Sequence, residues 1–560
     1  MAESSGVTAG ALSGRSPAFR AGDRDAPLVD LTVGELLTVR AGEYPHTEAL
    51  VGTRHGRDDT VRLSYGDLLR EARQVAAALR ALVDPGDYVA LWAPNTVEWT
   101  IVQYGAALAD VILVAVNPVL RDADLDYVLR HSRARVLIHA DRSRDYDLAT
   151  VAQRVCADIP GIRRISLSQW AQWLSAPVGE LAVSTARADS AVMLQYTSGT
   201  TGRPKGVLLT HRALVNVARL TMQACGVEAG SVCFNPLPLF HTAGCVIATL
   251  GPAWLGGTAV LCERFDAADA LAALARENVT VLFYVPAVLL ALLAAQRAGS
   301  APAPALRIIM GGAAVVSGEL IDGAAAVFGA EVYNLYGQTE LAPVLSLTRR
   351  GDTREDKLTT VGRQLPHVDC KVIDPDTGAT LNTGEVGEIC ARGYQQFIEY
   401  LHDPAATARA LDPEGFVRTG DLGWMDDRGY LRVTGRLKEL IIRGGENIAP
   451  AEVETVIAEH DDVLDVVAVA LPDERLGEGV AVACRIGSML PEPTSVRALS
   501  TWLYRRPTLY LLLLLVPPLL WFCAVYLGSL LTLLWQGFYT FDDFTMAVTP
   551  DLTFANLAAL

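Results

Sequence analysis

The segment Tyr196-Thr-Ser-Gly-Thr-Thr-Gly-Arg-Pro-Lys-Gly-Val207 combines glycines, hydroxyls and one lysine within a single loop. The glycines let the backbone approach an anion closely, and successive backbone N–H groups in such a loop form an anion-binding nest. Lys205 adds a point charge suited to phosphate. Apolar residues flank the loop on both sides, which predicts a turn between two buried strands; a flexible polar hairpin turn is the alternative. The loop residues that would contact an anion are Thr197, Ser198, Gly199, Thr200, Thr201 and Gly202.

The length and the composition of the chain limit its class. It has 560 residues, which is too long for one core and predicts about two to four domains. With 51% hydrophobic and 20% charged residues, most of it is expected to be globular. The net charge of −16 argues against nucleic acid as the main partner, whereas a nucleotide needs only a local positive site. The nine cysteines lack zinc-type spacing and are expected to be small buried residues in a reducing compartment.

Strand-like and helical patterns alternate along the chain. The pattern predicts a helix over residues 65–82, with Ser64 as its N-cap, and a buried strand over 87–92. Further apolar strands are expected at 111–116 and 134–139, separated by helices. This alternation predicts an α/β fold with largely parallel sheets.

Two later motifs contain side chains suited to a nucleotide: an aromatic ring, a hydroxyl and two carboxylates. Tyr336-Gly-Gln-Thr-Glu340 follows a predicted strand: Tyr336 can pack on a purine face, Thr339 can donate to a phosphate, and Glu340 is a hard oxygen ligand suited to Mg²⁺. Asp421 lies between glycines and fits a carboxylate that binds both ribose hydroxyls. Its alternative is an aspartate in a turn.

The loop at 196–207, together with the motif at 336–340, resembles the phosphate loop and acidic motif of adenylate-forming enzymes, the acyl-CoA synthetase superfamily, and the resemblance extends to about residue 498. It implies a cytoplasmic ligase that activates a small-molecule carboxylic acid with ATP and Mg²⁺. An acyl-adenylate would form first and then a thioester with coenzyme A. The expected acid is a medium- or long-chain fatty acid, with aryl acids as the competing choice.

The resemblance also assigns roles to single residues. Gly312, Ala313 and Gly337 would let adenine lie against the backbone, and His241 and Val285 would line the acyl pocket. Arg436 resembles a second nucleotide contact, Lys438 occupies the hinge position, and Gly444-Gly445 would line the CoA tunnel. The expected catalytic set is Thr197, Lys205, Glu340, Arg436 and Lys438. From the residues alone, the alternative for His241 is a structural role. The alternative for Val285 is an ordinary position in the hydrophobic core.

The resemblance stops in the small domain. Family members carry a lysine late in that domain, which stabilises charge during adenylation, but Lys438 is the last lysine of this chain. The sequence therefore predicts impaired adenylation. The expected domains are a flexible tail (1–27), a large adenylation domain (28–435), a truncated lid domain (436–500) and a transmembrane segment with a short tail (501–560).

The last 60 residues have a different composition. No charged residue occurs between Arg506 and Asp542, a run longer than the roughly 20 residues that cross a bilayer. We expect residues 508–535 to tether the catalytic body to the inner membrane, with a buried soluble helix as the alternative. Residues 504–544 resemble the start of an ABC-importer permease of the polyamine type, so transporter subunits are candidate partners. A rival hypothesis is a permease fragment fused to a vestigial nucleotide-binding module.

Overall fold

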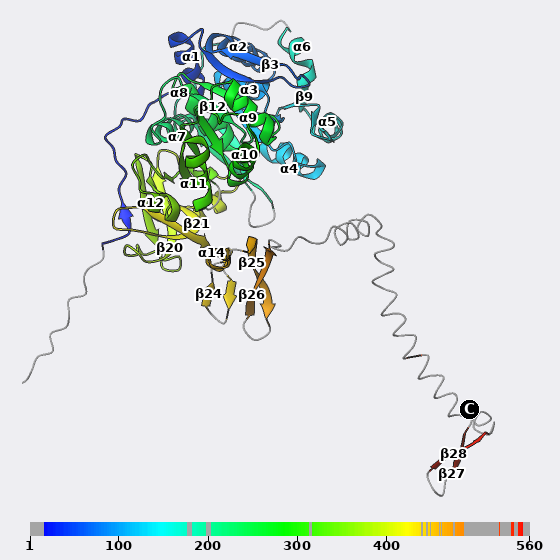
Figure 1. Cartoon of the computed structure of the whole chain (residues 1–560). Coiled ribbons are helices and arrows are strands. Elements are labelled where there is room, and N and C mark those ends of the chain that lie inside the picture. Colours follow the sequence, from blue (N-terminus) through cyan, green and yellow to red (C-terminus); the bar gives the residue numbers. More distant parts are fainter. Residues whose placement is uncertain are drawn as a thin grey trace, which may run out of the picture. The chain divides into compact units, whose positions relative to one another are not determined.

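The computed structural model describes residues 16–175, 182–197, 203–312 and 316–437, and shorter stretches beyond them (439, 441–443, 446–448, 450–458, 460, 462–473, 477–486, 526, 539–542 and 547–552). The chain divides into two compact units, Met1–Glu452 and Val453–Leu560. The first unit contains three large sheets, a two-stranded sheet of β7 (Arg142–Ser143) and β8 (Tyr146–Asp147), and the helices that pack on the large sheets (Figure 1).

A six-stranded sheet carries the loop that follows Tyr196. Its order is β11 (Lys205–Thr210), β10 (Ala191–Thr197), β5 (Ile112–Val116), β4 (Tyr88–Trp92), β6 (Val136–His139) and β9 (Arg163–Ser166). The strands from β10 to β9 are parallel, and β10 and β11 form an antiparallel pair. The expected pair of strands around the loop is therefore confirmed.

A nine-stranded sheet is parallel from β16 to β2. Its order is β18 (Arg363–Gln364), β17 (Ser346–Leu347), β16 (Glu331–Tyr336), β15 (Ile308–Gly312), β14 (Val281–Tyr284), β12 (Val232–Asn235), β13 (Thr258–Leu261), β2 (Glu48–Thr53) and β3 (Thr60–Ser64). Because parallel strands end at the same edge, the last residues of β14, β15 and β16 lie beside one another. The predicted α/β class with largely parallel sheets is confirmed.

The third sheet is antiparallel. Its order is β1 (Phe19–Arg20), β19 (Val368–Ile373), β20 (Gly387–Gly393), β21 (Val417–Met425) and β22 (Leu431–Arg436). The pairing of β21 with β22 sets Asp421 opposite Arg436. Two residues that lie apart in the sequence are thereby brought together.

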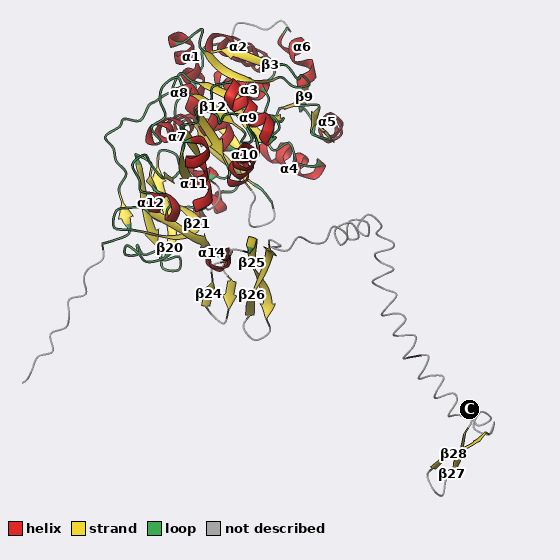
Figure 2. Ribbon diagram, viewed as in Figure 1, coloured by secondary structure: helices red, strands yellow, loops and turns green. Residues whose placement is uncertain are grey.

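Helices surround the strands of the first unit (Figure 2). The helix expected over residues 65–82 runs from Tyr65 to Arg80, and Ser64 caps it by accepting from the Asp67 backbone N–H. The helices are α1 (Val33–Glu43), α2 (Tyr65–Arg80), α3 (Val97–Leu108), α4 (Asp122–Ser132), α5 (Leu148–Ala157), α6 (Trp170–Leu174), α7 (His211–Ala224), α8 (Ala248–Trp254), α9 (Ala267–Arg276), α10 (Pro286–Ala298), α11 (Gly318–Phe328), α12 (Arg354–Thr359) and α13 (Pro404–Arg409).

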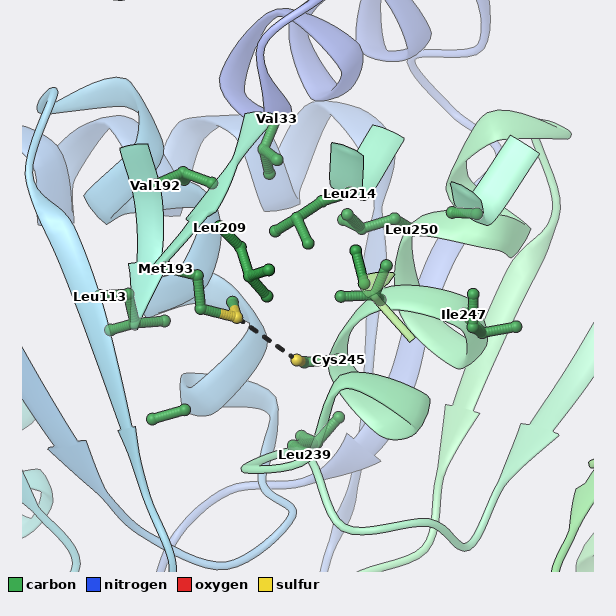
Figure 3. Packing of buried hydrophobic residues seen from close by; sticks show 14 of the residues in the cluster. Val33, Leu113, Val192, Met193, Leu209, Leu214, Leu239, Cys245, Ile247 and Leu250 are labelled. Carbon is green, nitrogen blue, oxygen red and sulfur yellow. Dashed lines mark hydrogen bonds between the residues drawn. The ribbon is translucent and has the colours of Figure 1, made fainter. Parts of the chain in front are cut away.

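One part of the main core lies where the six-stranded sheet meets the segment from Leu239 to Leu250. Met193 of β10 and Cys245 face each other across it, with Leu209 and Leu239 close by (Figure 3). All four side chains are buried. This packing fixes the start of the phosphate loop relative to the chain that follows the loop, because β10 ends at Thr197 only a few residues after Met193.

The remaining described elements follow β22. A hairpin joins β23 (Ile441–Arg443) to β24 (Glu446–Ile448), and α14 (Pro450–Ala458) follows it. The second unit contains an antiparallel hairpin of β25 (Val463–Asp473) and β26 (Gly477–Ile486), and a smaller one of β27 (Tyr539–Asp542) and β28 (Ala547–Leu552). Within it, the Ala468 N–H donates to Glu454 Oε1 at 2.9 Å.

The expected membrane tether requires a correction. No helix among the residues that the structure describes is long and apolar enough to cross a bilayer. The longest of them, α2, has 16 residues and carries several charges, whereas a crossing needs about 20 apolar residues. Except for Tyr526, residues 508–535 lie outside the described residues. The predicted inner-membrane localisation is therefore wrong on this finding.

Candidate active site

The phosphate loop is held at both ends by the β10–β11 pair. Thr197 is the last residue of β10 and Lys205 is the first residue of β11, and the two are partners in the register. Both residues are half-buried. The predicted donors between them, Ser198, Gly199, Thr200, Thr201 and Gly202, lie outside the described residues.

Lys205 lies against an aromatic ring that the sequence did not single out. Its Nζ is 4.6 Å from the centroid of the Tyr400 ring. The Tyr400 hydroxyl donates to Glu340 Oε1 at 2.7 Å. Tyr400 therefore links the predicted phosphate lysine to the predicted metal carboxylate. Burial and the neighbouring Glu340 raise the pKa of Tyr400, which keeps the phenol protonated as a donor.

Glu340 fits a metal-binding role. It lies in the short helix η3 (Thr339–Leu341) and is only 8% exposed. Among the described side chains, no lysine, arginine or histidine forms an ion pair with its carboxylate. Buried carboxylates are normally paired or coordinate metals. Hard oxygen donors suit Mg²⁺, so the donor chemistry agrees with the sequence expectation.

Asp421 is held by two donors from different strands. The Tyr336 hydroxyl donates to Oδ2 at 2.7 Å, and Arg436 Nε pairs with Oδ1 at 3.0 Å. Burial raises the pKa of Asp421, and the two donors oppose that rise. Asp421 lies within β21, so the alternative of a turn aspartate is wrong.

Two glycines allow close backbone packing: Gly312 is the last residue of β15, and Gly337 directly follows β16. A Cβ at Gly312 would lie 1.9 Å from the carbonyl oxygen of Leu335, and a Cβ at Gly337 would lie 2.1 Å from that of Pro343. Neither position has room for a side chain. The next residue of the expected adenine turn, Ala313, lies outside the described residues.

An apolar cavity of about 280 Å³ opens beside these glycines. His241 and Val285 line it, as the sequence predicted, and so do Gly312 and Gly337. Its other walls include Ala243, Ile247, Phe283, Tyr284, Met310 and Val344. Ala243 and Ile247 are the two ends of η2 (Ala243–Ile247), a π-helix, an irregularity that is frequent at functional sites.

His241 lines the cavity and is an exposed residue, with protein atoms packed around part of its ring. Burial lowers the pKa of His241, so the ring is neutral at neutral pH. The Ala243 N–H donates to His241 Nδ1 at 3.4 Å. In the neutral ring this leaves Nε2 as the protonated nitrogen, and therefore as the donor.

Three more predicted site residues, Lys438, Gly444 and Gly445, lie outside the described residues. Thr339 is buried in η3 next to Glu340. Sequence reasoning missed Tyr400 because no local pattern marks it. The only signal would have been its place just before the helix cap Asp403-Pro404, which says nothing of its partners.

The model of the AMP-binding enzyme family matches residues 37–401. The mitochondrial medium-chain acyl-CoA ligase ACSF2 of Rattus norvegicus is 30% identical over 502 residues, 83% of this chain and 81% of that protein. The 4-coumarate–CoA ligase 2 of Nicotiana tabacum is 32% identical over 429 residues, 74% of this chain and 78% of its own length. The ATP-bound structure of MatB from Rhodopseudomonas palustris matches with a TM-score of 0.72 at 26% identity, over 83% of this chain and 90% of that one.

Proposed function

Because the chain belongs to the AMP-binding enzyme family, we propose that it is an acid–thiol ligase that makes acyl-CoA in two steps. In the first step, a carboxylate oxygen of the acid attacks the α-phosphorus of ATP, and pyrophosphate leaves. In the second step, the thiol sulfur of CoA attacks the acyl carbonyl, AMP leaves, and the thiol proton passes to solvent. Both steps depend on positioning and on charge neutralisation.

One observation carries this proposal. Within five residues, the segment 336–340 touches all three parts of the required site. The Tyr336 hydroxyl binds Asp421, Gly337 lines the apolar cavity, and Glu340 accepts from Tyr400 beside Lys205. A ribose, an acyl chain and a triphosphate bound at these three points would meet around the same short segment.

The proposed roles follow from these contacts. Asp421 binds the ribose hydroxyls, with Tyr336 and Arg436 holding its carboxylate in place. Lys205 and the donors of the phosphate loop neutralise the β- and γ-phosphates, and Thr339 donates to the α-phosphate. His241, through Nε2–H, orients the carboxylate at the mouth of the cavity. From the sequence resemblance alone, we propose Lys438 as the hinge and Gly444 and Gly445 as a wall of the CoA tunnel; all three lie outside the described residues.

A magnesium ion belongs to the proposal through Glu340. When bound, such an ion neutralises phosphate charge and orients the leaving pyrophosphate. The chain's own contribution is a buried carboxylate that Tyr400 orients through one oxygen.

The cavity favours an apolar acid. Its walls are mostly aliphatic and aromatic, and ACSF2 is named as a medium-chain ligase. We therefore propose a medium- or long-chain fatty acid as the substrate. An aryl acid is the second candidate, because a 4-coumarate ligase is among the relatives.

The domain plan of the proposal has an adenylation domain over residues 28–435 and a short lid over 436–500. Residues 439–560 contain no lysine, so the proposed lid over 436–500 has no ammonium donor after Lys438 for the adenylation step. Removal of one such donor typically costs a factor of about 10² to 10³ in rate. We propose that adenylation is slow by a factor of this order, whereas thioester formation from supplied acyl-adenylate is retained.

The test compares the two half-reactions on the full chain. Pyrophosphate release is measured with ATP and a panel of fatty and aryl acids, and acyl-CoA formation is measured from synthetic acyl-adenylate. The expected result is slow pyrophosphate release with a medium- or long-chain acid and faster thioester formation. Fast adenylation would contradict the proposed impairment. The absence of both half-reactions with every acid tested would contradict the ligase function. The relatives are ligases, so a permease fragment with a vestigial nucleotide module is not favoured.

A further inference from the structure

The segment that carries Tyr400 is tied to both sides of the site by its backbone. The Ile398 N–H donates to the Leu208 carbonyl at 2.8 Å, and the Leu401 N–H donates to the Gly206 carbonyl at 2.8 Å. On the other side, the Phe397 N–H donates to the Glu340 carbonyl at 2.9 Å. The segment therefore bridges β11, which carries Lys205, and η3, which carries Glu340.

Lys205 and Glu340 present a problem of charge. Both are at least half-buried, they carry opposite charges, and neither forms an ion pair with any residue that the structure describes. Opposite charges attract strongly in a partly desolvated site. A direct pair between them would neutralise the groups that a triphosphate and its metal ion require.

The Tyr400 side chain contacts each charge with a different part of its ring. Its face lies against the Lys205 ammonium, a cation–π arrangement, and its hydroxyl edge donates to the Glu340 carboxylate. Phe397 packs against the same ring with centroids 4.9 Å apart, and the Tyr400 N–H donates to Thr407 Oγ1 at 2.9 Å. The Tyr400 ring therefore lies between the two charged groups.

We propose that Tyr400 is a positioning residue that separates Lys205 from Glu340 and keeps each free for its ligand. The lysine stays available to phosphate oxygens and the carboxylate to a divalent cation. This inference rests on the proposed function, because it concerns the triphosphate end of the same site. The ring is the spacer, and the hydroxyl only orients the carboxylate.

The experiment measures metal binding directly rather than turnover. Full-length protein is titrated with Mn²⁺ in the presence of α,β-methylene-ATP, which is not cleaved at the reacting bond, and bound Mn²⁺ is followed by electron paramagnetic resonance. Tyr400→Leu is expected to raise the Mn²⁺ dissociation constant at least about tenfold, because Lys205 then pairs with Glu340. Tyr400→Phe keeps the ring and is expected to change it less than about threefold.

A double-mutant cycle with Lys205→Met identifies the cause. If Tyr400 acts as a spacer, Tyr400→Leu changes Mn²⁺ binding less than about threefold in the Lys205→Met background, because the competing ammonium is gone. An equal loss in both backgrounds would overturn the inference. If Tyr400→Leu does not fold, Tyr400→Met is measured in the same two backgrounds, because it fills more of the space.

Phe397→Leu is the matched control. It removes the neighbouring ring from the same segment without touching either charged group, so Mn²⁺ binding is expected to stay within about twofold. A loss as large as that of Tyr400→Leu would assign the effect to loosening of the segment and overturn the inference. A wild-type protein that binds Mn²⁺ and the analogue but releases no pyrophosphate would contradict the proposed function alone. A wild-type protein that binds no Mn²⁺ would overturn the spacer role.

Discussion

At the proposed nucleotide end of the candidate site, the two carboxylates are held by side chains from other parts of the fold. The proposed acyl cavity is instead shaped by apolar packing and by glycines. Asp421 has two donors, Tyr336 and Arg436, and Glu340 has one, Tyr400. The cavity walls have few such partners: they are strand ends, the π-helix η2 and backbone at Gly312 and Gly337.

This difference predicts how each end responds to substitution. Removing a hydrogen-bonded carboxylate is costly, because its donors are then buried without a partner. An apolar wall that is changed in volume alters which ligand fits, and the rest of the site keeps its geometry. We therefore expect losses of affinity at the nucleotide end and shifts of specificity at the acyl end.

The largest effect is expected at Asp421. Asp421→Ala removes the proposed ribose contact and leaves the Tyr336 hydroxyl and Arg436 without their partner. The affinity for ATP is expected to fall by about a hundredfold or more, as measured by isothermal titration calorimetry with MgATP.

Tyr336→Phe is the graded control for that prediction. It removes one donor to Asp421 and keeps the ring that was predicted to pack on the purine, so the loss is expected to be about tenfold. If Asp421→Ala binds ATP within threefold of wild type, the carboxylate is structural and does not bind the nucleotide. The proposed contrast between the two ends would then be wrong.

The two ends also differ in how far the sequence predicts them. The hairpin around the phosphate loop, Glu340 and Asp421 were predictable because strand patterns and short motifs are local properties. The hydrogen-bond partners of these carboxylates were not predictable. Tyr400 meets Glu340 across 60 residues, and the Tyr336 hydroxyl meets Asp421 across 85 residues. Such contacts are created by the tertiary fold, and no periodicity or local composition encodes them.

His241 and Val285 were predicted together and line one cavity, but the dimensions of that cavity were not predicted. The volume of the cavity depends on how η2 and the ends of β14 and β15 pack together, which a single sequence does not specify. The inner-membrane localisation, which was wrong, had been predicted from composition alone. A long apolar run in a sequence indicates burial, but it does not distinguish burial in a bilayer from burial in a protein core.

A smaller effect is expected when the acyl cavity is narrowed. Ala243→Leu adds three carbon atoms to a wall of the 280 Å³ cavity. The ratio kcat/KM is expected to fall about tenfold for the longest acid that the wild type accepts, and to stay within threefold for short acids. The measurement is a series of straight-chain acids of increasing length.

Val285→Ala is the opposite change and serves as the control. It enlarges the same cavity, so the preferred chain length is expected to rise. If both variants lower activity equally for every acid, the cavity does not hold the acyl chain, and the contrast between the two ends fails.

The smallest effect is expected from the protonation of His241, where the two ends meet. Burial lowers its pKa from the ordinary value of 6.5, so the ring becomes protonated only when the pH falls below that value. A protonated ring attracts the substrate carboxylate more strongly than the neutral Nε2–H does. The KM for the acid is therefore expected to decrease by about threefold as the pH falls through the acidic range, and to be constant above pH 7.

The pH profile of His241→Gln separates this effect from the titration of the acid itself. Glutamine keeps a neutral donor at the cavity mouth and does not titrate, so its KM profile reports only the substrate, and the ratio of the two profiles isolates His241. A ratio that changes above pH 7 would mean that a neighbouring negative charge, rather than burial, controls this histidine. In that case His241 would depend on a charged partner, as the carboxylates of the nucleotide end depend on their donors, and it would belong to that end rather than to the apolar cavity.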